Sequence, residues 1–540
     1  MIPKLLCSIT TQKTLIVFTF LIFCTSVFSQ NEFITTWKTD NTGTSNDTSI
    51  TIPTTGAGYN FDVDWSYDGV TFNVGSQHIG TPGNIIHDYG MTGTYTVAIR
   101  GTFPRIHFDC GGDMEKIISI EQWGTNPWIS MKGAFYCCLN LVSNADDEPN
   151  LAGVLDASDM FWYALAFNAD LSSWVVSNIT DMSYMLGVTA VTGDLRDWDV
   201  SNVTSMYAMF SGTTAFNGDL SEWIVSNVSD MDNMFNGATV FNGDLREWNI
   251  SKLTSLSGMF SNATAFNGDF LSFWDVSLID DMSSMLTGTA FNGDLSTWEV
   301  GLVMDMSRMF SGTAFNGDLG DWDVSNVTYM SGMFAEATAF NGDLGGWDVS
   351  LVEEMSEMFS GATAFDQDLG SWDISSINSM TGMFLDVTLS TTNYDNTLIG
   401  WNTLTEAEGE TQIPIGITSF SGGNSTYCNG EAARESLIYV YSWFGLEDGG
   451  IDIDCTGLGL DDYDLASSIK LYPNPASIEF RIEGLLENSI LEIYNLNGLL
   501  VQKLHNYKGN PVDVSELSST VYFVKISNSN GTVTKRLIIK

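Results

Sequence analysis

The sequence predicts a mainly β protein with short helical turns, built as a solenoid of about 24–25 residues per coil and flanked by small β-sandwich domains at both ends. Between Phe167 and Phe384 a motif close to Ala-Phe-Asn-Gly-Asp-Leu-x-x-Trp-Asp-Val-Ser-Asn-Val-Thr-Asp-Met-Ser-x-Met-Phe occurs nine times. Its tryptophans recur in steps of 24, 25 or 26 residues, a period typical of stacked repeats. They are Trp174, Trp198, Trp223, Trp248, Trp274, Trp298, Trp322, Trp347 and Trp372.

Each repeat combines two apolar patterns. Leu195, Trp198 and Val200 open with a three-residue step and then alternate by two, which predicts a short strand. The following Val-Thr-x-Met-x-x-Met-Phe has steps of three and four residues, which predicts one or two helical turns with the Thr or Ser as N-cap. No single coil buries its own Trp, Met and Phe, so stacked coils are expected to share one core.

This repeat resembles the leucine-rich repeats of BspA-like bacterial surface proteins, with Trp and Met at positions where Leu is commoner. The resemblance covers roughly residues 110–450. It implies a leucine-rich-repeat-like solenoid and a surface protein, some members of that family being adhesive. It does not identify a ligand.

Composition narrows the range of partners. The 540-residue chain is 44% hydrophobic, has a formal net charge of −46 and a pI near 4.1. Nucleic acid is excluded as a partner, because phosphate binding needs clustered Lys and Arg that this chain lacks.

Residues 1–29 read as a signal peptide. Lys4 and Lys13 precede an apolar run at residues 15–24, which is too short to span a membrane, and small residues follow it. We expect cleavage between Ser29 and Gln30. No transmembrane segment is expected in the mature chain.

Residues 30–109 have no repeats. Residues 94–99 alternate between polar and apolar side chains, as do Phe61, Val63 and Trp65, which predicts a small antiparallel β domain. Tyr89 followed by residues 93–97 resembles the closing strands of a PKD-type, immunoglobulin-like domain.

The remaining boundaries follow the repeat. Residues 110–166 are degenerate opening coils, expected to fray as a cap, and residues 167–388 hold the nine regular repeats. Residues 389–446 form a C-terminal cap, within which residues 432–443 read as a helix. Residues 447–468 are an acidic, Gly-rich linker.

Five cysteines follow the signal peptide, in an exported chain where disulfides are permitted. Cys428 and Cys455 are the preferred pair, because they flank the segment after the last coil. The pairing among Cys110, Cys137 and Cys138 stays open, and an odd count leaves at least one thiol.

Residues 469–540 differ in charge from the repeats. They hold eight Lys plus Arg against six Asp plus Glu, whereas residues 151–390 hold four against 33, which marks a separate domain. The blocks at residues 471–476, 493–498, 512–517 and 521–526, with the basic end at 535–540, resemble the type A C-terminal sorting domain of the type IX (Por) secretion system. The resemblance implies the type IX machinery as a partner and display outside a Gram-negative bacterium.

No catalytic motif stands out. One acid recurs in every repeat, where stacking would place like charges about 4.8 Å apart. Either each carboxylate accepts backbone N–H bonds in its own turn, which we favour, or calcium ions thread between them. These acids are Asp170, Asp194, Asp219, Asp244, Asp269, Asp294, Asp318, Asp343 and Asp368.

The sequence therefore predicts a secreted, surface-displayed, non-catalytic repeat protein without a cofactor, which binds or adheres to a protein or polysaccharide. A structural spacer or surface-layer component without a specific ligand is the alternative. A carbohydrate-processing enzyme is a second alternative, but it needs one asymmetric pair of carboxylates, whereas every coil here repeats the same environment.

Overall fold

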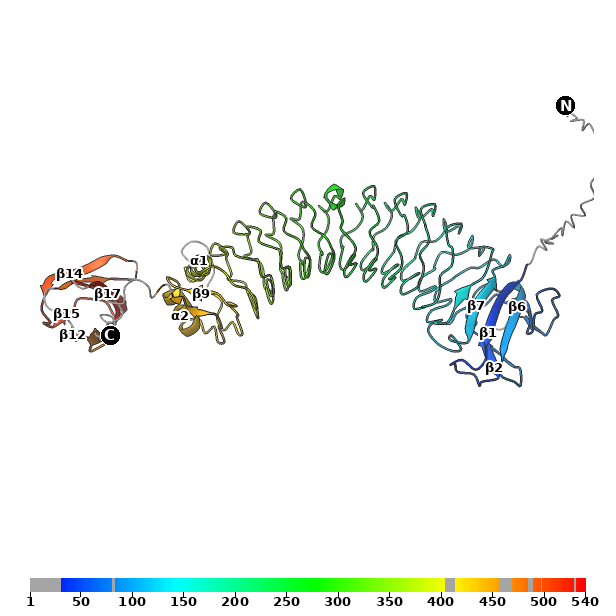
Figure 1. The fold of residues 1–540 in the computed structure, drawn as a ribbon, viewed down its shortest axis with the longest axis horizontal. Helices are drawn as coiled ribbons and strands as arrows, with labels where there is room; N and C mark the ends of the chain where they lie inside the picture. The colour runs from blue at the N-terminus through cyan, green and yellow to red at the C-terminus, as the bar shows by residue number, and fades with distance from the viewer. Residues whose placement is uncertain are drawn as a thin grey trace, which may run out of the picture.

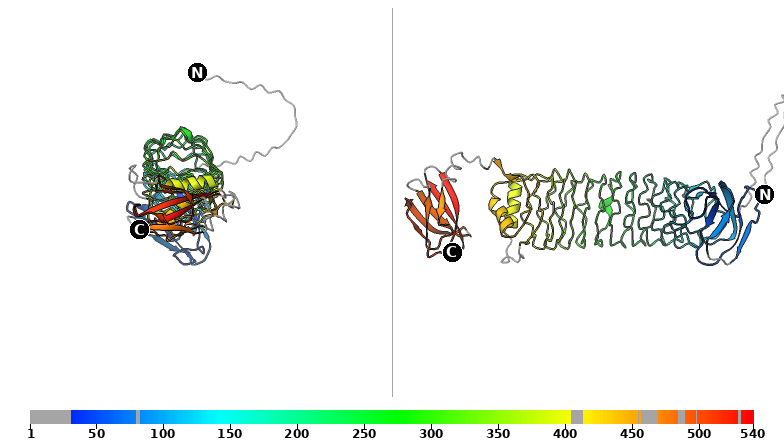
Figure 2. Two further views of the ribbon diagram at one scale, coloured as in Figure 1. Left: turned by 90° about the vertical axis from the view of Figure 1, so that its left-hand side faces the viewer. Right: turned by 90° about the horizontal axis from the view of Figure 1, so that it is seen from below.

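The computed structural model describes residues 31–79, 83–403, 413–453, 455, 469–483, 489–496, 498–528 and 531–540. A β-sheet lies at the N-terminal end, a curved row of coils follows, and two short helices lie at the far end of the row (Figure 1). Seen from below, the coils run side by side between the sheet and the helices (Figure 2). The predicted signal peptide, its cleavage point at Ser29 and Gln30, and most of the predicted linker at 447–468 lie outside the described residues.

The N-terminal region is a six-stranded sheet with the order β4-β3-β6-β1-β7-β8, beside a two-stranded sheet of β2 and β5. Strand β6 pairs antiparallel with β1 and β3, as its alternating pattern predicts. The strands are β1 (Phe33–Lys38), β2 (Ser49–Ile52), β3 (Asn60–Asp64), β4 (Ser76–Ile79), β5 (Ile85–Asp88), β6 (Thr94–Thr102), β7 (Ile117–Gln122) and β8 (Val142–Ser143).

This sheet does not end at residue 109. Strand β7 pairs antiparallel with β1, and β8 then pairs parallel with β7. Parallel pairing continues as a bridge between Pro127 and Asn150, where the coils begin. One buried cluster of side chains runs from Phe33 to Leu446, so the sheet and the coils share a core.

We call residues 126–403 the coil stack. The predicted leucine-rich-repeat-like solenoid, with a strand and a helical turn in each coil, is wrong. The described residues form five sheets of two to six strands, and none of these forms a solenoid or a closed barrel. Between the edge strand β8 and residue 380, the coils have only isolated parallel bridges, such as Asp305 to Tyr329, and one short 3-10 turn, η1 (Leu271–Phe273).

The backbone hydrogen bonds explain the absence of strands and helices. In one coil the N–H groups of residues 306, 308, 310 and 312 donate to carbonyls of the next coil at 2.7–2.9 Å. The N–H groups of residues 309, 311 and 313 donate instead to carbonyls three residues back in their own coil. A β-strand directs its backbone amides to neighbouring strands, and an α-helix directs each amide to the carbonyl four residues back. A coil that alternates between its neighbour and the carbonyl three residues back forms neither element.

Positive φ angles produce this mixed pattern. Arg308 has φ 58° and Gly312 has φ 68°, and other coils have positive φ at the same two positions. An L-residue pays for this conformation and glycine does not, which explains why many coils place Gly there. The Thr hydroxyls do not cap helices either, because Thr204 donates to the carbonyl of Thr180 in the preceding coil at 3.0 Å.

From Trp198 onward, a tryptophan links each regular coil to the one before it. The Trp298 indole N–H donates to the Leu271 carbonyl at 2.9 Å, and the ring is only 4% exposed. The same bond is made to a leucine carbonyl by Trp198, Trp223, Trp248, Trp274, Trp322, Trp347, Trp372 and Trp401. Each indole thus stays buried with its polar N–H satisfied.

Ring spacings account for the curvature of the stack. Centroids of Phe310 and Phe334 in successive coils are 5.6 Å apart, whereas those of Trp298 and Trp322 are 6.3 Å apart. Coils are therefore closer on the Met-Phe side, which we call the inner side, than on the Trp side. The 3-10 turn η1, beside Trp274, accordingly lies at the crest of the arch in Figure 1.

The far end of the stack is covered by helices. Helix α2 (Glu431–Tyr439) begins and ends near the predicted helix, and α1 (Thr391–Trp401) replaces the outer part of a coil. Strands β9 (Thr426–Tyr427) and β10 (Gly450–Ile451) pair parallel beside them. Trp401 fills the Trp position of a further coil although its step from Trp372 is longer.

The C-terminal region has its own core, which includes Phe480, Leu491, Val524 and Leu537. It contains a three-stranded sheet, β11-β12-β15, and a four-stranded sheet, β14-β13-β16-β17. The strands are β11 (Lys470–Tyr472), β12 (Glu479–Glu483), β13 (Ser489–Tyr494), β14 (Leu500–Tyr507), β15 (Val512–Asp513), β16 (Val521–Asn528) and β17 (Gly531–Ile538).

Within the described ranges we find no helix with the length and apolar character needed to cross a membrane.

Candidate binding surface

The repeated acids lie in turns on the outer side of the stack, next to the tryptophans. The carboxylate of Asp294 accepts the N–H of Ser296 at 2.9 Å, two residues further along the chain. The same bond is made by Asp170, Asp194, Asp219, Asp244, Asp318, Asp343 and Asp368. In the coil with η1, Asp269 instead accepts the side-chain amide of Asn267 at 3.0 Å.

These bonds agree with the backbone alternative for the acids. Hydrogen bonds from Ser296, first from its N–H and then from its hydroxyl, lower the pKa of Asp294. The Ser172 hydroxyl and N–H likewise lower the pKa of Asp170. Among the described residues, no group of three or more His, Cys, Asp or Glu side chains is placed to hold a metal ion.

Shallow grooves lie between neighbouring coils beside the buried tryptophans. One of about 490 Å³ is lined by Trp298, Glu299, Leu302, Asp321 and Asp323, among others. Similar grooves lie at Trp198 and Trp223. They repeat along the outer side and carry much the same acidic and small polar groups, so none of them stands apart from the others.

The inner side differs in the first coils, where aromatic rings lie against one another across successive coils. We call Tyr136, Trp162, Tyr163, Tyr184 and Tyr207 the aromatic row. Centroids of Tyr136 and Trp162 are 4.8 Å apart with ring planes at 11°, and Trp162 stacks on Tyr184 at 4.1 Å. Tyr207 meets Tyr184 edge-on at 5.1 Å, and Tyr163 lies 5.7 Å from Trp162.

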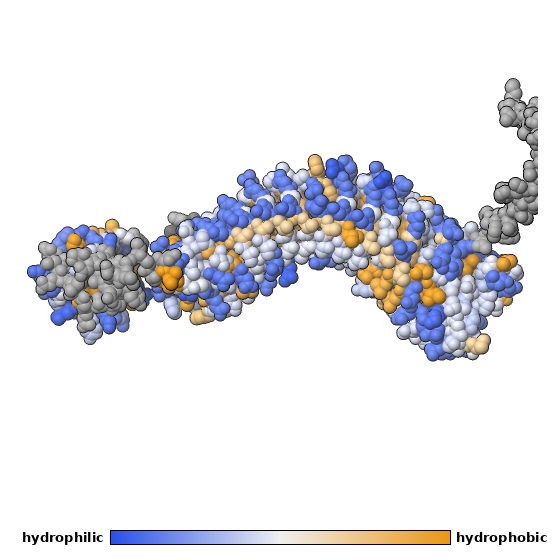
Figure 3. Space-filling model, in the orientation of Figure 1, coloured by the Kyte–Doolittle hydropathy of each residue, from blue (hydrophilic) through white to orange (hydrophobic). Residues whose placement is uncertain are grey.

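These rings are not core residues. Tyr163 is 44% exposed, and the other four are partly buried. Exposed Ile129, Leu155 and Leu165 belong to the same coils. Figure 3 shows hydrophobic surface gathered over this end of the stack, whereas the outer edge of the regular coils is hydrophilic.

The neighbouring coil is shaped to receive Trp162. A Cβ added at Gly187 would lie 3.2 Å from Cδ1 of Trp162, so glycine lets the indole lie against the next coil. The backbone register aligns Gly187 with Ser211 and Asn236 in later coils, which have no indole beside them.

Carboxylates lie beside the rings. Burial raises the pKa of Asp159, and the charges of Asp109, Asp156 and Asp181 add to this effect while Lys132 opposes it. Burial, a hydrogen bond with Tyr207 and the charge of Asp159 raise the pKa of Tyr184 to about 12. The rings therefore lie in a negative local potential.

Sequence reasoning missed the aromatic row. The signal was available, because Tyr136, Trp162 and Tyr184 interrupt positions that hold Ser, Gly, Asn or Ala in most later coils. This departure is recognisable only once the register between coils is known, because the first coils are too irregular in sequence to align with the regular repeats.

Two disulfides lie at opposite ends of the coil stack. Cys428 joins Cys455, the pair favoured from the sequence, and Cys110 joins Cys137, a pairing that the sequence left open. Cys138 is a buried free thiol, and burial raises its pKa.

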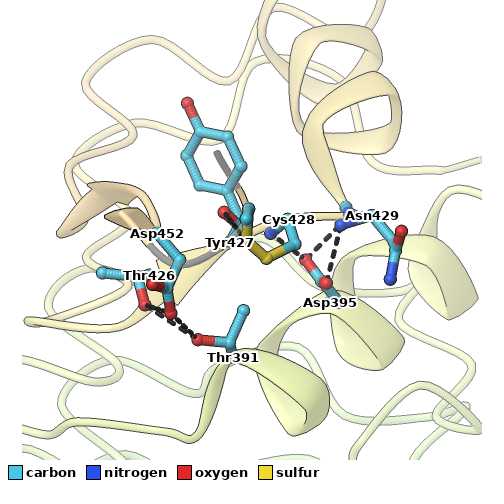
Figure 4. Close-up of a disulfide and its surroundings, with 9 residues drawn as sticks. Thr391, Asp395, Thr426, Tyr427, Cys428, Asn429 and Asp452 are labelled. Carbon is cyan, nitrogen blue, oxygen red and sulfur yellow. Dashed lines mark hydrogen bonds between the residues drawn. A yellow bond between two sulfur atoms is a disulfide. The ribbon is translucent and has the colours of Figure 1, made fainter. Parts of the chain in front are cut away.

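Figure 4 shows how the Cys428–Cys455 bridge is supported. Asp395, on α1, accepts the N–H groups of Cys428 and Asn429 at 2.8 and 2.7 Å. On the other side Asp452 accepts the Thr391 hydroxyl at 2.5 Å. The bridge thus holds β9, β10 and α1 together and forms part of the cap rather than a reactive site.

Comparison with known families separates the coil stack from the C-terminal region. Residues 113–193, 186–298 and 286–401 match the family described as Mycoplasma protein of unknown function, DUF285. Residues 470–540 match the family described as Secretion system C-terminal sorting domain. No curated protein matches the chain. These matches do not test the resemblance to BspA-like surface proteins or to a PKD-type domain, and both resemblances stay predictions.

The three DUF285 matches together span residues 113–401, more than half of the 540-residue chain. The C-terminal match confirms the sorting domain, which implies secretion and surface attachment through the type IX system. The chain therefore belongs to the DUF285 family through its coil stack, and it carries a C-terminal secretion sorting domain.

Proposed function

We propose that this chain is a non-catalytic binding protein displayed on the outer surface of a Gram-negative bacterium, where it adheres to a protein or glycan ligand. One observation carries the proposal: a row of aromatic rings, one exposed and four partly buried, lies on a stack whose later coils present mainly small side chains at the same positions. Exposed apolar surface of this kind marks interaction sites in soluble proteins.

The arrangement of the acids supports a non-catalytic role. Eight of the nine repeated carboxylates are engaged by the backbone of their own turn, and they occupy near-identical surroundings. General acid–base catalysis needs two groups whose environments drive their pKa values apart.

Export is part of the proposal. The mature chain is expected to start near Gln30, and residues 469–540 are expected to engage the type IX machinery and to be removed at the surface. Mass spectrometry of peptides shaved from intact cells should find coil peptides but no peptides ending at Lys540. Recovery of the chain from the cytoplasm alone would contradict export to the cell surface.

Binding is tested with the purified chain on arrays of glycans and extracellular matrix proteins. A spacer or surface-layer component is the second candidate, favoured by the uniform polar surface of the regular coils. The binding proposal expects at least one saturable ligand. A chain that binds nothing on the arrays but forms ordered layers would support the spacer instead.

A further inference from the structure

We propose that the aromatic row and the carboxylates beside it form a docking site for a cationic protein segment, one that presents Arg or Lys side chains. This inference rests on the proposed binding function and names the chemistry of its ligand. The site lies on the inner side of the first coils, between the Cys110–Cys137 bridge and Tyr207.

The rings offer one open ring and several phenol oxygens to guanidinium groups. Tyr136, Trp162 and Tyr184 form a nearly parallel stack with centroid separations of 4.8 and 4.1 Å, so both faces of Trp162 are covered. Tyr163 lies outside that stack and is 44% exposed. Arginine stacks on an open aromatic face, and phenol oxygens accept hydrogen bonds from its N–H groups. A row that crosses several coils offers contacts to several side chains of an extended segment.

The carboxylates beside the rings favour a positively charged ligand. Burial, and then the charges of Asp159 and Asp109, raise the pKa of Tyr136. Asp156 and Asp181 lie close enough to Asp159 to influence its ionisation, and the charge of Lys132 opposes theirs. Lys132 already pairs with Asp156 at 3.6 Å. A cationic partner would gain from the remaining negative charge, and the net charge of −46 would steer it towards the stack.

The row is specific to these coils, which argues against a purely structural origin. The core beneath it is complete without it, because Phe135, Phe161 and Leu186 fill the inward positions and are fully buried. Gly187 makes room for an indole that contributes little to that core.

Tyr329 provides a matched control. It is a single tyrosine, 45% exposed, on a regular coil where bridges place it between Asp305 and Glu354. It therefore has acidic neighbours and similar exposure to Tyr163, but among the described residues no aromatic ring stacks on it.

The test is isothermal titration of the full-length chain with an octapeptide containing four arginines. The same peptide with neutral citrulline in place of arginine is the matched probe, and cellohexaose is the sugar probe. We expect the arginine peptide to bind at least tenfold more tightly than the citrulline peptide, a difference of about 1.4 kcal/mol. Affinity should fall as salt is raised.

Variants locate the site. Trp162→Ala and Asp159→Asn should each weaken arginine-peptide binding, the first by about tenfold, while Tyr329→Ala binds as the unaltered chain does. Thermal melts run on every variant verify folding. Equal affinity for the two peptides, or binding that Trp162→Ala leaves unchanged, would overturn the proposal.

The cellohexaose titration and the ligand arrays distinguish a glycan site from a cationic-peptide site, and this inference from the proposed function. Cellohexaose binding that Trp162→Ala abolishes, without arginine-peptide binding, would make the row a glycan site and overturn the cationic assignment. An array ligand insensitive to Trp162→Ala would remove this inference but leave the proposed function standing. No array ligand and no arginine-peptide binding for the unaltered chain would remove both.

Discussion

The first coils and the regular coils share a backbone but differ in what they expose. In both, alternate amides bond to the next coil and the inward side chains are buried. On the inner side, the first coils present stacked aromatic rings where most later coils present Ser, Gly, Asn or Ala. Repeated residues therefore maintain the stack, whereas departures from the repeat mark where a ligand is to be sought.

The largest expected effect tests the shared core. Trp298→Ala should lower the free energy of unfolding by about 3–5 kcal/mol, because it leaves a large cavity between coils. It also leaves the Leu271 carbonyl without its indole donor. Chemical denaturation of the variant and the unaltered chain measures the loss.

Trp123→Ala provides the comparison in the opening coils. The sequence predicts a frayed cap there, but that expectation is wrong, since Trp123 is 1% exposed and packs against Phe33, Trp128 and Trp174. We therefore expect a loss of similar size. A negligible loss at Trp123 would mean that the opening coils fray after all.

The two disulfides provide the next comparison, one at each end of the stack. Both join cysteines 27 positions apart, so the chain-entropy model expects each to contribute about 2–4 kcal/mol. Replacing Cys428 and Cys455 with serine should therefore lower the melting temperature about as much as replacing Cys110 and Cys137. Equal melts before and after reduction of the unaltered chain would contradict the prediction.

Two carboxylates, Asp294 and Asp159, should change the stability of the chain in opposite directions as the pH is lowered. Asp294 has a lowered pKa, so its stabilising contribution is present above its unfolded pKa and is lost as pH falls through its folded pKa. Asp159 has a raised pKa, so its favourable contribution exists at low pH and is lost as pH rises through the folded value.

Unfolding midpoints measured from neutral pH to pH 3 test these opposite signs. Asp159→Asn should stabilise the chain at neutral pH, with the gain vanishing below about pH 4, near the unfolded pKa. Asp294→Asn should give no gain at neutral pH. The same sign for both substitutions would show that the two environments do not differ as described.

The smallest expected effect concerns the repeated acid itself. Asparagine can accept the same N–H bond, so Asp294→Asn should melt close to the unaltered chain, with Asp294→Ala slightly lower. Melts in calcium and in chelator should coincide. A large rise in calcium that Asp294→Asn abolishes would replace the backbone account with a metal-stabilised stack.

The buried positions were predictable because they recur with a period. Trp298, Met306 and Phe310 are buried as their spacing indicates, and the turns at the repeated acids follow from the Asp itself. The predicted strands and helical turns failed because residues such as Arg308 adopt positive φ. The pattern of polar and apolar side chains along the sequence does not reveal that change in backbone conformation.

The aromatic row was harder to predict for a different reason. Tyr136, Trp162 and Tyr184 are 26 and 22 residues apart, so no single period aligns them. Their contact depends on which amide of one coil meets which carbonyl of the next. Only the folded chain supplies that register, and with it the stacking of the rings.

One paired measurement tests the division between stability and binding most directly. Trp298→Ala and Trp162→Ala are each assayed for melting temperature and, well below the lower melt, for affinity to the arginine octapeptide. We expect Trp298→Ala to lose stability and keep its affinity, and Trp162→Ala to keep most of its stability and lose about tenfold in affinity, or about 1.4 kcal/mol. Losses of both properties in both variants, or of affinity in neither, would contradict it.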